Sequence, residues 1–297
     1  KETKGPGGRP RHDVVMMLKI LVLQRYYNLS DEQAEYQIND RLSFQKFLGI
    51  TLSDAVPDEK TIWLFRETLS EAGRVKKLFR RFERHLSQSG LMGQEGKIID
   101  ASFVDVPRQR NSREENEEIK LGKVPEVFKE NGNRLRQKDV EARWAKKGGE
   151  VYYGYKDHVK VDRTTKLIED YEVTEASVHD SQAVEDLVEE DDGTLHGDSA
   201  YSGEKIETIL KESGVKGEIC EKGYRNHPLS EEQKKSNRER SRIRARVEHI
   251  FGFMTNTMRD GLKMRWIGMR RIAVGIGLLN LVYNMARYEQ IMRLKLA

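Results

Sequence analysis

The sequence predicts an α/β protein with a mixed β-sheet and flanking helices, preceded by an all-α domain. Two patterns predict this class. Residues 13–90 place apolar side chains at helical spacing, whereas residues 96–223 contain five short runs of strand character, with helices between the later ones. We therefore expect a helical domain at residues 1–95 and an α/β domain at residues 96–297, which carries a basic insertion at about residues 105–150.

The helical part follows a basic arm, residues 1–12, that is rich in glycine and proline. This arm either follows a phosphate backbone or is a terminus without a role. The apolar spacing over residues 13–28 predicts a first helix. Ser30 and Gln33 predict a capping box that starts a second helix, and residues 44–50 are expected to form a short apolar turn.

A later helix is expected to begin at Asp58, with Trp63, Leu64 and Leu69 on its buried side. A helix with a basic face follows and ends near Gly90. A bundle of short helices with basic edges is compatible with helix-turn-helix recognition of DNA and equally with a dimerisation bundle. We favour DNA recognition.

Residues 96–107 predict a buried strand that carries one acid, Asp100, between Ile99 and Ala101. A carboxylate in such a place costs desolvation free energy unless a positive charge lies opposite it. We expect that charge to be a divalent metal ion.

Residues 108–148 lack apolar periodicity and form the expected insertion, partly helical. Cations outnumber anions in its second half, which contains Arg136 and Lys138. The segment is either a solvated connector or a basic flap over a nucleic acid, and the excess of cations favours the flap.

Residues 151–162 and 166–176 alternate in the manner of strands around a turn and predict a hairpin. Lys156 and His158 share one face of its first strand. Next to the Asp100 strand, these two side chains can contact a phosphate or a metal-bound oxygen, or can simply line the sheet surface.

The following segment predicts a helix at residues 179–190, a short strand within residues 194–201 that stops at Asp198, a helix at residues 204–214 and another short strand at residues 217–223.

A long helix is expected at residues 234–258, and cations crowd its first half, with only Glu239 opposing them. The cations are Lys234, Lys235, Arg238, Arg240, Arg242, Arg244 and Arg246. The apolar side chains form one stripe with a period near 3.6. Glu248 lies roughly 60° past the edge of that stripe, so it can point along the edge of the sheet. The apolar stretch at residues 272–286 is shorter than the roughly 20 residues of a membrane helix, which predicts a core helix.

Composition excludes some classes of function. The charged fraction is 34% but the net charge is only +4, so the net charge alone does not predict a polyanionic partner. The distribution of the charges along the chain matters more. A single cysteine, Cys220, excludes an internal disulfide and a cysteine zinc site, and fits a reducing cytosol.

Three acids stand out by position: Asp100 within a strand, Asp198 just after one, and Glu248 on the helix that follows the sheet. Metal-assisted phosphoryl transfer needs such a set, because two hard cations about 3.5 to 4 Å apart must be held by oxygen ligands. Carboxylates alone suit Mg²⁺ or Mn²⁺ better than zinc. Spacing by itself proves little among 49 acidic residues.

Four blocks, taken in order, resemble the DDE transposases of bacterial insertion sequences. They are GKIIDASFVDVP, YYGYKDHVKVD, HGDSAYSG and RIRARVEHIFGF. Residues 8–50 also resemble the N-terminal region of that family, so the resemblance covers nearly the whole chain. It implies a ribonuclease-H-like core whose catalytic, metal-binding residues are Asp100, Asp198 and Glu248. It further implies that Mg²⁺, or Mn²⁺ in its place, supports cleavage at the ends of an element and joining of the freed 3′-hydroxyl to target DNA.

The family's signature on the third-acid helix has Tyr, Arg, Glu and Lys. Arg244 matches the Arg, but Ser241 stands at the Tyr position and Thr255 at the Lys position. These departures put in doubt any grip on the DNA end from those two places. Arg244 either pairs with Glu248 or binds the scissile strand.

We expect the DNA contacts to come from six basic residues: Arg240, Arg244, Lys156, His158, Arg136 and Lys138. The expected partner is double-stranded DNA, both element ends and target, and no membrane. Two ends must be joined in concert, so a homodimer is expected, in the cytoplasm and associated with the nucleoid. A domesticated DNA-binding protein and a nuclease that only hydrolyses are the alternatives.

Overall fold

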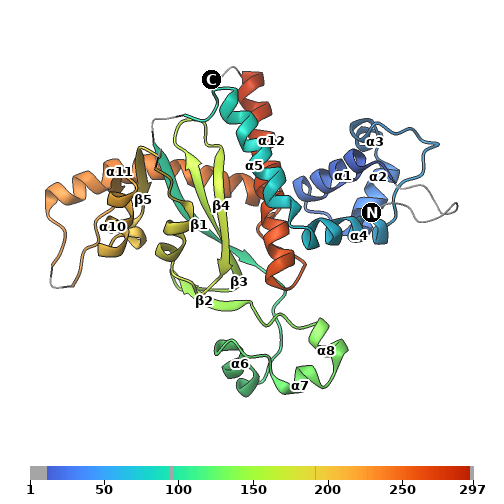
Figure 1. The fold of residues 1–297 in the computed structure, drawn as a ribbon, viewed down its shortest axis with the longest axis horizontal. Helices are drawn as coiled ribbons and strands as arrows, with labels where there is room; N and C mark the ends of the chain where they lie inside the picture. The colour runs from blue at the N-terminus through green and yellow to red at the C-terminus, as the bar shows by residue number, and fades with distance from the viewer. Residues whose placement is uncertain (1–11, 94–95, 191, 226, 295–297) are drawn as a thin grey trace.

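A computed structural model describes residues 12–93, 96–190, 192–225 and 227–294. The predicted α/β class is confirmed: within these residues a six-stranded mixed sheet lies between layers of helices, with a group of helices to one side (Figure 1). The basic arm expected at residues 1–12 lies outside the described residues, apart from His12.

The N-terminal helices are α1 (Val14–Tyr26), α2 (Asp31–Asp40), α3 (Leu42–Leu48) and α4 (Glu59–Glu71). The predicted capping box is present at the start of α2, where the Gln33 amide donates to Ser30 Oγ and the Ser30 amide donates to Gln33 Oε1. The turn expected at residues 44–50 is instead helix α3. Phe44 and Leu48, one helical turn apart, are both buried by it, and it ends at Gly49 in the left-handed conformation.

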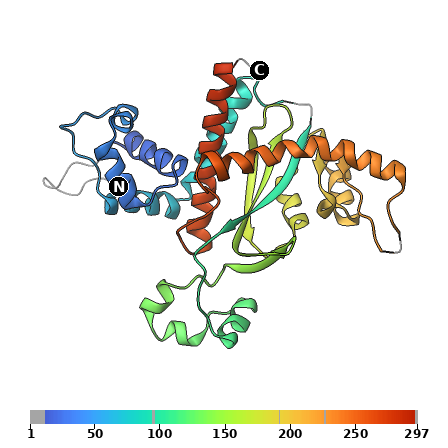
Figure 2. The ribbon, with the colours of Figure 1, turned by 180° about the vertical axis from the view of Figure 1, so that it is seen from behind.

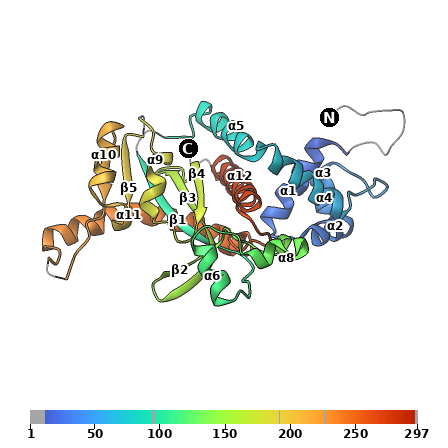
Figure 3. The same cartoon turned by 60° about the horizontal axis from the view of Figure 1, so that its bottom comes forward.

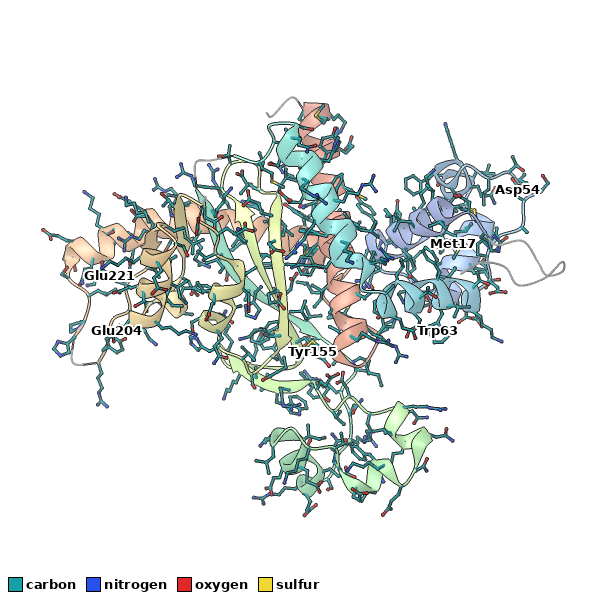
Figure 4. All side chains as sticks on the ribbon, viewed as in Figure 1. Met17, Asp54, Trp63, Tyr155, Glu204 and Glu221 are labelled. Atoms are coloured by element: carbon teal, nitrogen blue, oxygen red, sulfur yellow. The ribbon has the colours of Figure 1, made fainter. Side chains whose placement is uncertain are left out.

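The predicted buried side of α4 is right for Leu69, which packs against the core of the N-terminal helices, but wrong for Trp63 and Leu64. Trp63 and Leu64 are 45% and 58% exposed, and Trp63 lies on the outer side of the N-terminal helices (Figure 4). The buried side instead carries Ile62, Arg66 and Glu67. Arg66 is neutralised by Asp31 and Glu67 accepts a hydrogen bond from Arg271, so ion pairs offset the burial of polar side chains.

The sheet has the strand order β2-β3-β1-β5-β6, and β4 pairs with β3. The strands are β1 (Lys97–Asp105), β2 (Arg143–Lys147), β3 (Glu150–Asp162), β4 (Ile168–Glu175), β5 (Thr194–Gly197) and β6 (Lys216–Ile219). β1, β3 and β4 are antiparallel, whereas β1, β5 and β6 are parallel. The five predicted strands are all present. β2 was not predicted, because its residues lie in the basic segment and only Trp144 and Ala145 are apolar.

Helices cover both faces of the sheet. On one face lie α11 (Glu231–Gly252), a π-helical turn (Phe253–Thr257) and α12 (Met269–Leu294), and α11 crosses the sheet in Figure 2. On the other face lie α9 (Val184–Leu187) and α10 (Glu204–Glu212). Ile98 packs toward the first face and Ile99 toward the second, as expected for neighbours in a strand. A 3₁₀ turn (Asp180–Ala183) and α9 replace the longer helix expected at residues 179–190.

Helix α12 joins the N-terminal helices to the sheet. Val274 and Leu278 belong to the apolar core of α1 to α4, whereas Ile276 and Leu279 belong to the core beneath the sheet. Helix α5 (Arg74–Gln88) lies along α12 in Figure 3 and contributes Phe79 to the sheet core. In the described part of the chain no helix is long and apolar enough to cross a membrane.

The segment between β1 and β2 folds into three short helices that stand apart from the sheet (Figures 1 and 2). They are α6 (Arg113–Lys120), α7 (Glu126–Lys129) and α8 (Gly132–Arg136). Phe128 is fully buried among them, with the Arg134 guanidinium 5.1 Å from its ring centroid. The division of the chain at residue 95, with an insertion at about residues 105–150, stays a prediction.

Candidate active site

Two of the three predicted acids are brought together by neighbouring parallel strands. β1 and β5 pair with Lys97 opposite Leu195 and Ile98 opposite His196. Two residues further along the same register, Asp100 stands beside Asp198 at the carboxyl end of β5. Electrostatic repulsion between these two carboxylates contributes to raising the pKa of Asp100.

Asp100 is a buried carboxylate with few partners. It is 7% exposed, and burial is the main cause that raises its pKa. Its Oδ1 accepts a hydrogen bond from the Ala101 amide at 2.8 Å, and its Oδ2 accepts one from Arg244 Nη1 at 3.0 Å. These two contacts, together with the Lys147 ammonium, oppose the rise in pKa. A buried carboxylate beside a second one favours a cation at this position.

Asp198 is held by the turn that follows β5. It caps the 3₁₀ turn Ser199–Tyr201, with the Ala200 amide donating to its Oδ1 at 2.8 Å. The strand ends just before it at Gly197, which is closely packed, since an added Cβ would lie 3.1 Å from the Tyr201 ring and 3.3 Å from Ile99. The position of Asp198 is therefore fixed by backbone geometry.

Glu248 is linked to Asp100 through Arg244. Both residues lie on α11, one helical turn apart, and the distance from Arg244 Nη2 to Glu248 Oε1 is 3.5 Å. Arg244 therefore contacts Asp100 and Glu248 at once. The Glu248 side chain is 63% exposed, while the stripe beside it, including Val247 and Ile250, is buried as predicted.

The donor set fits a hard divalent cation, because the three acids offer only carboxylate oxygens. In the described residues, however, no three histidine, cysteine or acidic side chains gather closely enough to hold a metal ion. Arg244 is the cation that now neutralises Asp100, and Glu248 meets Asp100 only through it.

Two of the predicted DNA contacts are corrected by the strand register. Asp100 pairs with Val159, so Lys156 and His158 point to the opposite face of the sheet. Lys156 is 8% exposed and forms an ion pair with Asp180 at 2.7 Å. His158 is fully buried, and burial lowers its pKa to about 4, so it is uncharged at neutral pH. Neither side chain is open to a phosphate in this structure.

The other side chains predicted to contact DNA differ in whether the rest of the protein already binds them. Arg240 is held by Glu218 at 3.1 Å and by the Ile219 carbonyl at 2.7 Å. In the insertion Arg136 is exposed, whereas Lys138 donates to the Arg110 carbonyl at 2.8 Å. Their roles in DNA binding stay predictions.

The two positions that depart from the family signature have local partners. Ser241 Oγ lies 3.7 Å from Cys220 Sγ, and Thr255 Oγ1 donates to the Phe251 carbonyl at 2.9 Å. Ser241 thus faces β6 and its flanking residues, and Thr255 bonds back to its own helix.

Sequence reasoning passed over Tyr201, which lies next to the aspartates. It is 1% exposed, and within the described part of the chain its hydroxyl has no hydrogen-bond partner. Burial raises its pKa well above the usual value, and the carboxylates of Asp100, Asp180 and Asp198 add to the rise. The only signal in the sequence was the position of this aromatic residue, three after Asp198.

Comparison with protein families identifies the fold and its class. The family model described as transposase DDE domain matches residues 92–285, and a second, described as transposase domain (DUF772), matches residues 2–68. The first match includes the six strands, both aspartates and Glu248. The DDE domain is a ribonuclease-H-like fold, which confirms the predicted fold class. The chain belongs to the family of DDE-domain transposases.

Proposed function

We propose that this transposase cuts the ends of an insertion sequence and joins the freed 3′-hydroxyl to target DNA, with Asp100, Asp198 and Glu248 holding Mg²⁺. Mn²⁺ is expected to substitute, since both ions accept oxygen ligands. The observation that carries the proposal is the closeness of Asp100 on β1 to Asp198, which directly follows the neighbouring strand β5, with Glu248 joined to Asp100 by Arg244.

Each residue has a definite task in this proposal. Asp100 and Asp198 supply oxygens from rigid positions, one in a central strand and one at a capped turn. Glu248 supplies an oxygen from an exposed side chain that is free to change rotamer. Bound Mg²⁺ would activate the attacking oxygen and stabilise the leaving oxygen. Arg244 would leave Asp100 when the metal binds and would then be available to a DNA phosphate.

We propose that exposed cations of α11 bind the phosphate backbone of DNA. Lys235, Arg238, Arg242 and Arg246 are exposed and recur every three or four residues, so they form one stripe on α11. Eleven residues of helix span about 16 Å, several times the rise of about 3.4 Å per phosphate of one DNA strand. Arg246 and Glu248 are about 200° apart around the helix, so the stripe lies on a different face of α11 from Glu248.

The protein is proposed to act as a homodimer on double-stranded DNA, because joining two element ends in concert requires two active sites. Sedimentation of the protein with and without a DNA duplex tests this part. A single protomer bound to each joined pair of ends would contradict it.

The test of the reaction is a cleavage and strand-transfer assay with a duplex that carries the element ends, in Mg²⁺. Asp198→Asn is expected to abolish both steps and to leave DNA binding in a gel-shift assay nearly intact, because the change removes a ligand charge but not the fold. Asp186→Asn is the matched control, since Asp186 is an exposed acid on α9.

The outcomes separate the alternatives. Cleavage without joined product would identify a nuclease that only hydrolyses, and binding without either step would identify a DNA-binding protein that has lost the reaction. Equal loss of cleavage and binding in Asp198→Asn would mean that the residue is structural.

A further inference from the structure

Behind the two aspartates lies a buried polar cluster that the proposed reaction does not use. It consists of Lys156, Asp180 and Tyr201, on the face of the sheet opposite α11. Lys156 Nζ donates to Asp180 Oδ1 at 2.7 Å and to the Val178 carbonyl at 2.6 Å, so these two charges satisfy each other. The Tyr201 hydroxyl is the unsatisfied member, because none of the described residues is a partner for its proton or its lone pairs.

An unpaired buried hydroxyl costs folding free energy, so its retention calls for an explanation. The aromatic ring of Tyr201 is explained by packing, because it lies in the apolar core of α9 and α10 and against Gly197. A phenylalanine would supply the same packing. The hydroxyl is therefore the part of the side chain that packing does not account for.

The hydroxyl lies among carboxylates. Asp100, Asp180 and Asp198 all act electrostatically on it, and burial keeps it protonated, which leaves it able to donate a hydrogen bond. Asp180 already accepts from Lys156, and both oxygens of Asp100 accept hydrogen bonds. Tyr201 and Asp198 also belong to one turn, because the Tyr201 amide donates to the Asp198 carbonyl at 3.1 Å.

We propose that Tyr201 is a positioning residue whose hydroxyl donates to the Asp198 carboxylate when a divalent cation binds, and so orients that carboxylate as a ligand. The inference rests on the metal site proposed above. Hydrogen bonds of this kind commonly fix the orientation of metal ligands, and their loss costs about 10- to 100-fold in metal affinity or activity.

The test is Tyr201→Phe, with Mn²⁺ binding followed by electron paramagnetic resonance of the free ion, with and without a blunt DNA duplex. We expect Mn²⁺ affinity to fall by roughly tenfold. The melting temperature without metal should stay the same or rise, because the variant removes an unpaired buried hydroxyl and keeps the ring. The rise in melting temperature that Mn²⁺ produces should become smaller.

Tyr283→Phe is the matched control. Tyr283 is also a buried tyrosine, but its hydroxyl donates to the Lys166 carbonyl at 2.8 Å, in the turn between β3 and β4. Its loss should lower the melting temperature and leave Mn²⁺ affinity unchanged. A purely structural role of Tyr201 would give this same pattern or no change at all.

Asp198→Asn separates the two proposals. If that variant loses Mn²⁺ binding while Tyr201→Phe binds as the parent does, the role of Tyr201 is overturned and the metal site stands. If the parent and Asp198→Asn bind Mn²⁺ equally, in the presence and absence of DNA, the metal site itself is wrong and the inference fails with it.

Discussion

Asp157 is a fully buried carboxylate on the face of the sheet that α12 covers. Its Oδ1 accepts a hydrogen bond from Asn280 at 3.0 Å, and its Oδ2 has no partner among the residues that the structure describes. Burial raises the pKa of Asp157 to about 7, from an ordinary value of 3.8. The folded protein therefore binds this proton more tightly than the unfolded chain does.

The sign of the pH dependence follows from that difference. The stabilising contribution of Asp157 is fully present below about pH 3.8 and is lost as the pH rises to about 7. Asp157→Asn removes a titration worth about 1.4 kcal/mol per pH unit across this window, so the fall in unfolding free energy between pH 5 and pH 8 should shrink by roughly 2 to 3 kcal/mol. Urea unfolding of the parent and the variant at pH 5 and pH 8 measures this difference in unfolding free energy.

Part of the pH dependence should remain, because burial also raises the pKa of Glu169 to about 7. Asp186→Asn, at an exposed position, should keep the full dependence of the parent. If Asp157→Asn also kept it, Asp157 would not be the titrating group.

In the site, the identity of the acidic residues was easier to predict from the sequence than the face of the sheet to which a side chain points. Asp100 and Asp198 could be singled out because each sits at a strand where a carboxylate is out of place. Lys156 and His158 were assigned to DNA because they share a face of the neighbouring strand. Which face that is depends on the register of β1 against β3, and pairing Asp100 with Val159 turns both away from the acids.

At the scale of elements, β3 changes partners at Gly154. Up to that residue β3 pairs with β2, and from it onward with β1 and β4. Gly154 has φ +148°, and an added Cβ would lie 2.3 Å from the Val104 carbonyl oxygen. The strand can bend here only without a side chain.

Gly154→Ala should therefore lower the unfolding free energy by roughly 3 kcal/mol or more, as a backbone strain and a steric clash combine. Gly203→Ala is a close control, because Gly203 has φ +143° but open space around its Cβ position. The difference between the two variants in urea unfolding isolates the clash with Val104. Equal losses would show that β3 can shift to accommodate the methyl group.

Helix α11 gives the element-scale prediction about DNA. Arg238 and Arg242 are exposed members of the proposed phosphate stripe, whereas Lys205 and Lys211 are exposed cations on α10, on the other face of the sheet. Changing Arg238 and Arg242 together to Gln should weaken binding to any DNA duplex and reduce the slope of log affinity against log salt by roughly 2. Fluorescence anisotropy over a range of salt concentrations measures the slope.

The double variant of Lys205 and Lys211 to Gln has the same change in net charge and should leave the slope unaltered. Arg240→Gln is expected to act differently again, because Arg240 is tied to Glu218 and the Ile219 carbonyl. Arg240→Gln should clearly lower the free energy of unfolding, with only a small effect on the slope of log affinity against log salt. A large loss of slope in the Lys205 and Lys211 variant would move the DNA path to α10.

The prediction of elements from sequence failed where burial did not follow residue type. Long apolar runs gave α1, β1 and α12 correctly. Trp63 and Leu64 of α4 were predicted as buried, but the buried side includes Arg66 and Glu67, whose partners Asp31 and Arg271 are distant in sequence. Strand β2 was missed because it is a solvent-exposed edge strand of mostly basic residues, held by its pairing with β3.

At the scale of the whole molecule, α12 packs against both the N-terminal helices and the sheet. Leu278 is fully buried in the core of α1 to α4, and its neighbour Leu279 is fully buried in the core beneath the sheet. Because α12 packs in both cores, disruption of one core should also destabilise the other. The two halves of the chain should therefore unfold together, although the sequence predicts them as separate domains.

Leu278→Ala tests this coupling. It removes a buried side chain and should lower the unfolding free energy by about 2 to 5 kcal/mol. Hydrogen exchange measured by mass spectrometry should show faster global exchange in α1 and in β1 alike, because both depend on α12. Leu294→Ala, at a 48% exposed position of the same helix, should change neither. If Leu278→Ala accelerated exchange only in α1 to α4, with β1 as protected as in the parent, α12 would be coupling the two parts by contact without making them one cooperative unit.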